Sequence, residues 1–212
     1  MHEQHAPWAV QAWQHWHRPW AVTHASWLQE ADLTAATGGC GELALRLHYP
    51  AWCRRYALEP GLAGFDDSLW WRLFGLAQAP FDRVAQRVGL TLAFAANRRR
   101  RLQRDDAVHD VATIRWALER AHFVPESVVA EMGKAASPVV AAQHAAHSLR
   151  ACLVDEAPAL WARMGLRFPR EHVDVDAPPA RLADTGARGH LTKLWAAAAR
   201  SEQQASDRMK LS

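Results

Sequence analysis

Apolar residues recur every three or four positions along most of this 212-residue sequence, and this period constrains the fold more than any other feature. One such stripe consists of Phe81, Val84, Val88, Leu92 and Ala95. Almost no segment alternates with the two-residue period of a half-buried strand. We therefore predict an all-α fold, a compact multi-helix domain with an extended C-terminal segment from Leu166 to Val175.

A second periodic run follows the aspartates at positions 105 and 106 and is the clearest helix of the sequence. Its apolar positions are Val108, Val111, Ile114, Leu118, Ala121 and Phe123. Asp105, Asp106, His109 and Asp110 gather at its start, and carboxylates beside a histidine also suit metal or acid–base sites. We favour helix capping, because acidic residues at a helix start accept hydrogen bonds from unpaired amide groups and complement the helix dipole.

The opening segment, residues 1–33, carries five of the 11 tryptophans and is predicted to be helical. Trp13, Trp20 and Trp27 recur every seven residues, and Trp16 lies three positions after the first. All four would lie near one face of a helix. The favoured interpretation is that this stripe docks on the protein's own core. A detachable helix that binds a partner is the alternative.

Length and composition fit one globular domain, residues 1–212, whose polar tail at 201–212 is expected to fray. The three cysteines are odd in number and lack the paired spacing of a metal site or disulfide framework, so we expect reduced thiols. No signal peptide is apparent, and no apolar run approaches the ~20 residues that span a bilayer. We expect a cytoplasmic protein without direct membrane insertion, for which any membrane association would come through a partner.

Twelve histidines raise the question of a metal. His144 and His147 could share a helix face, but no Glu of an HExxH motif and no nearby third ligand accompany them. We interpret them as partly exposed surface histidines. The sequence also lacks a nucleophile elbow and a phosphate-binding glycine loop. We therefore expect no catalytic residue, no metal and no cofactor.

A run of arginines is the one local concentration of charge: Arg98, Arg99, Arg100, Arg101 and Arg104. Four consecutive residues on a helix point all round it, so some of these side chains must face solvent or a partner. Three interpretations remain: a solvated helix C-terminus, contact with an acidic protein surface, and nucleic-acid binding. A short run without interleaved aromatic residues is a weak nucleic-acid signal. We predict that the cluster binds a protein partner.

Two blocks resemble the YscK/SctK family of type III secretion proteins. The first, Phe81 to Leu102, matches the family's leucine-rich helix with an RLGL-like core, a short hydrophobic stretch and an arginine pair. The matching residues are Arg87, Val88, Gly89, Leu90, Leu92, Arg98 and Arg99. The second, Leu160 to Pro169, is similar to the family's pattern of tryptophan, basic residue, leucine, arginine and proline.

The resemblance covers about Asp67 to Pro169, whereas the tryptophan-rich opening departs from the family pattern. The abundant tryptophan and arginine suggest the Hrp branch of plant-associated bacteria. The resemblance implies a helical, non-enzymatic, cytoplasmic adaptor of the injectisome sorting platform, a virulence-associated protein-transport machine. It would link the inner-membrane ring protein SctD, through the cytoplasmic domain of SctD, to the pod protein SctQ. A nucleic-acid-binding regulator using the Arg98 to Arg104 cluster is the alternative function.

Overall fold

A computed structural model describes residues 6–30, 41–59, 61, 66, 68–96, 110–133, 141–173 and 185–211. Every regular element in these ranges is a helix, which confirms the predicted all-α fold. The chain divides into two compact units, where the sequence analysis expects a single domain. Unit 1 combines Met1–Gln78 with Ala157–Asp174, and unit 2 combines Ala79–Glu156 with Val175–Ser212. Each unit joins distant chain segments, which periodicity alone does not reveal.

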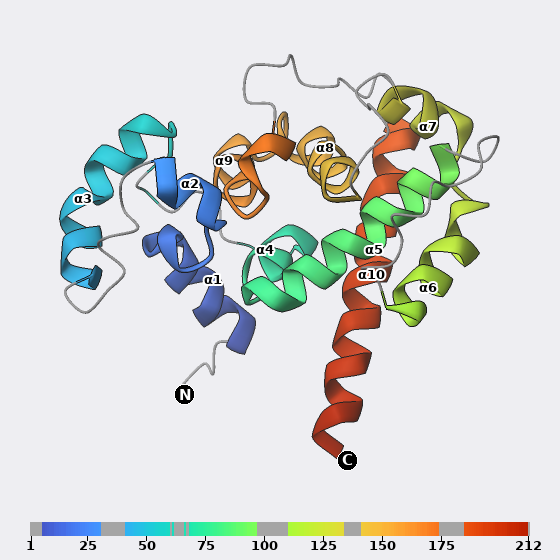
Figure 1. Cartoon of the computed structure of the whole chain (residues 1–212), viewed down its shortest axis with the longest axis horizontal. Coiled ribbons are helices and arrows are strands. Elements are labelled where there is room, and N and C mark those ends of the chain that lie inside the picture. Colours follow the sequence, from blue (N-terminus) through green and yellow to red (C-terminus); the bar gives the residue numbers. More distant parts are fainter. Residues whose placement is uncertain are drawn as a thin grey trace. The chain divides into compact units, whose positions relative to one another are not determined.

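Unit 1 is built from short helices (Figure 1). They are α1 (Pro7–His17), the 3-10 helix η1 (Pro19–Ala21), α2 (Ala25–Glu30), α3 (Gly41–Arg55), α4 (Leu69–Phe74), α9 (Pro158–Gly165) and the 3-10 helix η4 (Arg170–His172). Helix α1 packs on α4. At Gly75, directly after α4, a Cβ atom would lie 2.5 Å from the carbonyl oxygen of Trp8, so this close approach requires glycine.

The tryptophans of the opening segment divide between core and surface. Trp16 and Trp27 are buried, which confirms for these two the interpretation that the segment docks on its own core. Trp16 packs against Trp71, with ring centroids 5.3 Å apart. Trp13 is 53% exposed, so the prediction of one shared buried face is wrong for this residue. The reason is that the buried face of α1 is set by Ala12 and Trp16, four positions apart, and Trp13 is turned about 100° round the helix from Ala12.

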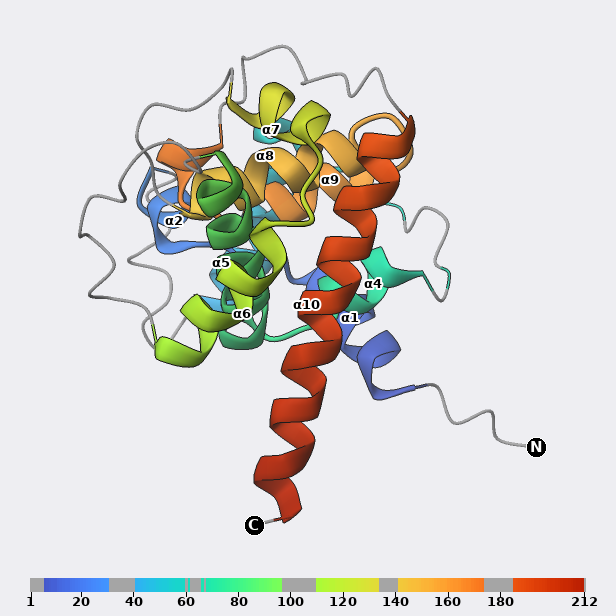
Figure 2. The ribbon, with the colours of Figure 1, turned by 90° about the vertical axis from the view of Figure 1, so that its right-hand side faces the viewer.

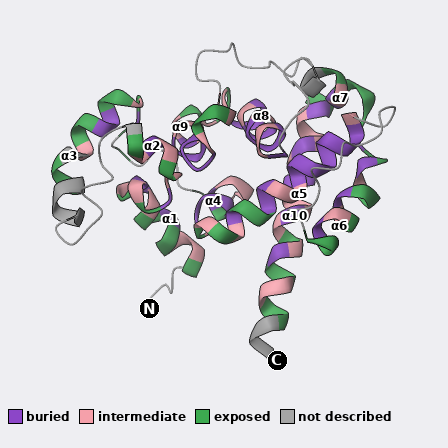
Figure 3. Ribbon diagram, viewed as in Figure 1, coloured by how far each residue is buried: buried purple, intermediate pink, exposed green. Residues whose placement is uncertain are grey.

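Unit 2 comprises α5 (Gln78–Ala96), α6 (Val111–Ala121), α7 (Glu126–Gly133), α8 (Ala141–Leu153) and α10 (Thr185–Leu211) (Figure 2). Helices α7, α8 and α10 pack against one another. The five predicted stripe residues of α5 are all buried, which confirms that stripe. Burial extends all round the second half of α5, from Val88 to Ala95 (Figure 3).

Gly89 explains how closely α5 and α8 approach. A Cβ atom at this position would lie 1.8 Å from the carbonyl oxygen of Ala141, far inside van der Waals contact. Glycine therefore lets the two backbones touch where any side chain would force them apart. The glycine of the RVGL block has a packing function in this chain.

The C-terminal part differs from expectation in two places. Leu166 to Phe168 form a turn followed by η4, so this part of the predicted extended segment is wrong; residues 174–184 lie outside the described residues. The tail beyond Ser201 was expected to fray, whereas α10 stays helical to Leu211. Glu202 is buried within this stretch, and its contacts anchor the helix to α5.

Candidate interaction surfaces

The arginine cluster predicted to bind a partner lies outside the described residues. All five members, Arg98 to Arg101 and Arg104, fall between the end of α5 and the start of α6. Their role as a protein-binding surface stays a prediction. Asp105, Asp106 and His109 lie in the same stretch.

Asp110 is the described member of the acidic cluster, and it is the N-cap of α6. Its Oδ1 accepts a hydrogen bond of 2.9 Å from the amide of Thr113. Hydrogen bonding from Thr113 lowers the pKa of Asp110, which keeps the carboxylate charged at the positive end of the helix dipole. This geometry confirms the capping interpretation for Asp110.

His144 does not lie on the surface, so that part of the sequence interpretation is wrong. It is 4% exposed on α8, a helix on which Ala141, Ala145 and Ser148 are buried as well. Burial, with a smaller contribution from His147, lowers the pKa of His144 to about 4, so the imidazole is neutral at neutral pH. Among the described residues, no three His, Cys, Asp or Glu side chains gather where they could hold a metal ion.

Unit 1 contains two buried arginines on α9 and the turn that follows it. Arg163 is 2% exposed and donates hydrogen bonds to the Trp16 carbonyl at 2.8 Å, the Tyr49 hydroxyl at 3.2 Å and the Glu59 carbonyl at 2.5 Å. Its guanidinium carbon lies 4.1 Å from the centre of the Trp16 ring. A planar donor over an aromatic face suits arginine and not lysine. Arg163 thus joins α9 to three separate segments.

Arg167 binds the C-terminal end of α4. It is 1% exposed, and its guanidinium donates to the carbonyls of Phe74 at 3.1 Å and Leu76 at 2.8 Å. Its Nε donates to Oε1 of Gln78, whose Nε2 donates back to the Arg167 carbonyl at 3.0 Å. A cation here satisfies helix-end carbonyls and complements the negative end of the dipole.

Sequence reasoning missed both arginines, because unpaired arginine is most often a surface residue. Their positions on the apolar stripe of the helix could have indicated that they are buried. Arg163 and Arg167 lie three and seven positions after Leu160, on the stripe that also holds buried Met164. A cation at core positions of an apolar helical stripe indicates a buried carbonyl-binding role. These residues belong to the second block of the family resemblance, and in this chain they stabilise unit 1.

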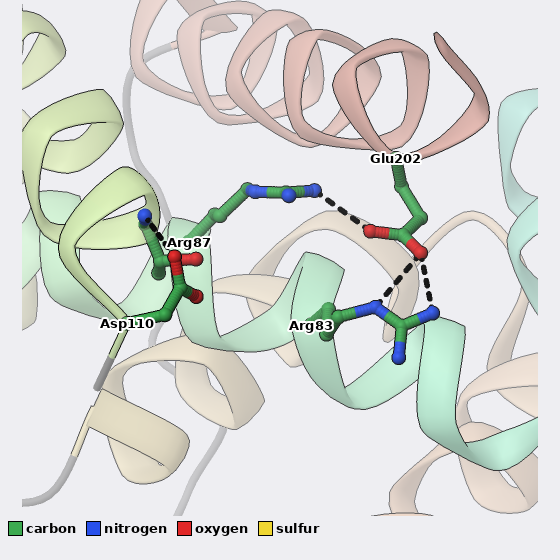
Figure 4. A network of polar contacts seen from close by, with 5 residues as sticks. Arg83, Arg87, Asp110 and Glu202 are labelled. Atoms are coloured by element: carbon green, nitrogen blue, oxygen red, sulfur yellow. Dashed lines mark hydrogen bonds and ion pairs between the residues drawn. The ribbon is translucent and has the colours of Figure 1, made fainter. Parts of the chain in front are cut away.

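A network of charges holds α10 on α5 in unit 2 (Figure 4). Oε1 of Glu202 accepts from Nε and Nη2 of Arg83 at 2.8 and 2.6 Å, and Oε2 accepts from Nη1 of Arg87 at 3.0 Å. The side chain of Glu202 is 5% exposed and that of Arg87 is 12% exposed. Asp110 lies near enough for the positive charge of Arg87 to help lower its pKa. Two cations and two carboxylates therefore balance at the junction of α5, α6 and α10.

The outward side of α1 carries an exposed apolar pair, which we call the α1 patch: Val10 and Trp13. Val10 is 46% exposed and Trp13 is 53% exposed. The Trp13 ring lies against His17, with centroids 4.7 Å apart. Helix α1 contains no Asp, Glu, Lys or Arg, so no such charge on the helix itself opposes burial of this pair against a partner. Tryptophan is among the residues most often found at the energetic centre of protein interfaces.

The outward side of α6 combines apolar and charged residues, which we call the α6 face: Val111, Arg115, Leu118 and Glu119. Val111 is 74% exposed and Leu118 is 44% exposed, and both charged residues are exposed. The opposite side of the helix is buried through the small residues Thr113, Ala117 and Ala121. Phe123, 75% exposed, follows in the turn after the helix. Helix α6 thus buries Thr113, Ala117 and Ala121 and exposes Val111 and Leu118. Figure 3 shows both buried and exposed positions along its ribbon.

Both surfaces are suited to binding other proteins, because exposed apolar side chains on ordered helices gain free energy when a partner covers them.

In the part of the chain that the structure describes, no helix is long and apolar enough to cross a membrane. Comparisons with protein-family models, with curated proteins and with solved structures found no match for this chain.

Proposed function

We propose that this chain is a non-enzymatic, cytoplasmic adaptor of a type III secretion sorting platform. It binds SctQ and the cytoplasmic domain of SctD, and through SctD it lies at the periphery of the inner membrane. The partners come from the resemblance of the blocks at Phe81 to Leu102 and Leu160 to Pro169. The exposed apolar side chains on α1 and α6 support the ability to bind proteins.

The observation that carries this proposal is the outward position of Trp13 beside Val10. The other described tryptophans of the segment are less exposed: Trp16 and Trp27 lie in the core of unit 1, and Trp8 and Trp20 are half-buried. A half-exposed indole costs free energy in water and gains it when a partner removes that surface. The α1 patch therefore supports a protein contact in unit 1, and the predicted arginine cluster supplies a second, charged contact in unit 2.

The test is binding of the purified full chain to SctQ and to the cytoplasmic domain of SctD, measured for the wild type and two variants. Trp13→Ala removes the apolar anchor, and we expect it to weaken one contact by about tenfold or more, as at interface hot spots. Reversal of Arg98 to Arg101 to glutamate should weaken the other, because like charges at an interface repel.

Controls separate binding from folding. Leu47→Ala changes a more exposed apolar residue of unit 1, at 74% exposure against 53% for Trp13, and should leave both affinities unchanged. Alanine at Arg98 to Arg101 should weaken binding less than glutamate does. If the wild type binds neither protein but binds DNA with a steep salt dependence, the regulator is the better description.

A further inference from the structure

We infer that the α6 face binds a second copy of this chain, in an antiparallel, two-fold symmetric helix pair. The starting observation is that α6 buries small side chains and exposes larger apolar ones. Its buried side is made of Thr113, Ala117 and Ala121, while Val111 and Leu118 point outward. A helix that faced only solvent would gain by the opposite arrangement.

The charges on the α6 face are self-complementary. Arg115 and Glu119 are both exposed, and they lie four residues apart on either side of the level of Ala117. Each is about 3 Å along the helix axis from that level. In an antiparallel pair with its two-fold axis at this level, Arg115 of one copy lies opposite Glu119 of the other, and the reverse pair forms as well. A parallel pair would instead set Arg115 against Arg115.

The apolar residues fit the same register. Leu118 lies one residue from the axis, so the Leu118 side chains of two copies meet at the centre. Val111, at the start of α6, is level with the turn that carries Phe123 of the second copy. All three apolar residues are exposed in the single chain, by 74%, 44% and 75% for Val111, Leu118 and Phe123. Apolar contact at the centre and ends, with ion pairs between, is the arrangement of a specific helix pair.

The expected affinity follows from size. Helix α6 has 11 residues and is about 16 Å long. The area that so short a helix can bury is small beside the ~800 Å² per partner of a stable interface. We therefore expect a dissociation constant of roughly 100 µM, which becomes effective when copies are held close together. This inference does not depend on the adaptor role.

Sedimentation equilibrium of the full chain, from about 5 to about 500 µM, tests the pair. The wild type should show a reversible monomer–dimer equilibrium. Arg115→Glu and Glu119→Arg should each weaken association by about tenfold, because every cross pair becomes repulsive. An equimolar mixture of these two variants should associate at least as well as the wild type, since both cross pairs become attractive again.

Two further variants complete the design. Leu118→Glu, at the centre, should abolish association, and Lys193→Glu, an exposed charge reversal on α10, should leave it unchanged. Circular dichroism of each variant shows whether it remains folded, and the mixture compares the same two proteins, so a folding defect cannot imitate its result. A wild type that stays monomeric over the whole range would overturn the inference, whether or not the α6 face binds SctQ or SctD. So would a mixture that associates no better than its components.

Discussion

Arg163 and Trp16 are joined twice, by a hydrogen bond of 2.8 Å from Nη1 to the Trp16 carbonyl oxygen and by stacking of the guanidinium 4.1 Å from the indole ring centre. Both residues are buried. The contact links α1 to α9, and the two residues lie 147 positions apart in the sequence. It shows that an arginine in the middle of an apolar stripe is a structural element of unit 1.

Arg163→Met is expected to lower the free energy of unfolding by about 3 kcal/mol, because it leaves the acceptors on Trp16, Tyr49 and Glu59 without their donor. Arg163→Lys should lose a similar amount, since a single ammonium cannot reproduce the planar fork. Urea denaturation followed by circular dichroism measures both. Arg54→Met, at an exposed site on α3, is the control and should change stability by less than about 0.5 kcal/mol.

Gly89→Ala is expected to destabilise unit 2 by about 2 kcal/mol or more. The new Cβ would lie 1.8 Å from the Ala141 carbonyl oxygen, and the resulting overpacking outweighs the ~1 kcal/mol that alanine gains in helix propensity. Gly189→Ala in α10 is the matched control, because nothing lies within 4 Å of its added Cβ. That variant should be more stable than the wild type by about 0.5 to 1 kcal/mol in the same denaturation experiment. Equal effects at the two glycines would contradict the close approach of α5 and α8.

Glu202→Gln is expected to weaken the attachment of the C-terminal half of α10 to α5. The substitution leaves Arg83 and Arg87 facing a neutral amide, and we expect a loss of about 2 kcal/mol, moderated because Arg83 is 44% exposed. Amide hydrogen exchange should accelerate in α10 after Ser201 and stay slow in α8. Asp207→Asn, at an exposed position of the same helix, should leave both rates as they are.

Stability is expected to fall as the pH falls from about 6.5 to about 4 through His144. Its pKa is lowered from 6.5 to about 4 in the folded chain, so within this window the unfolded chain binds a proton that the folded chain does not. The contribution amounts to roughly 3 kcal/mol over the window. His144→Gln should remove this part of the pH dependence, as measured by urea denaturation at several pH values. His122→Gln, at an exposed site, should retain it.

The sequence predicted the helical elements well, because apolar side chains on a 3.6-residue period must be covered along one face. The α5 stripe from Phe81 to Ala95 is the best example, and every member is buried. In α6 the period predicted a helix, but the side buried against the rest of unit 2 carries Thr113 and Ala117, and the larger apolar residues Val111 and Leu118 are exposed. Periodicity locates apolar residues on a helix, and it does not show whether the partner that covers them belongs to the same chain.

The remaining differences have one physical origin, which is contact between distant segments. Arg167 is buried because carbonyls at the end of α4 and in the turn after it need donors, and those carbonyls lie 91 to 94 positions away in sequence. Glu202 anchors a polar stretch that local composition would leave to fray, because two arginines of α5 meet its carboxylate. Local patterns can indicate that such a residue is buried, but they do not identify the distant group that it contacts.

Formation of a ternary complex tests the adaptor role most directly. Sedimentation velocity of the full chain mixed with SctQ and the cytoplasmic domain of SctD is expected to show a species containing all three proteins. Trp13→Ala and the reversal of Arg98 to Arg101 should each remove one partner from that species while the protein remains folded. A wild-type chain that forms no complex with either protein would contradict the adaptor role, and a chain that binds only one of them would contradict the link between SctD and SctQ.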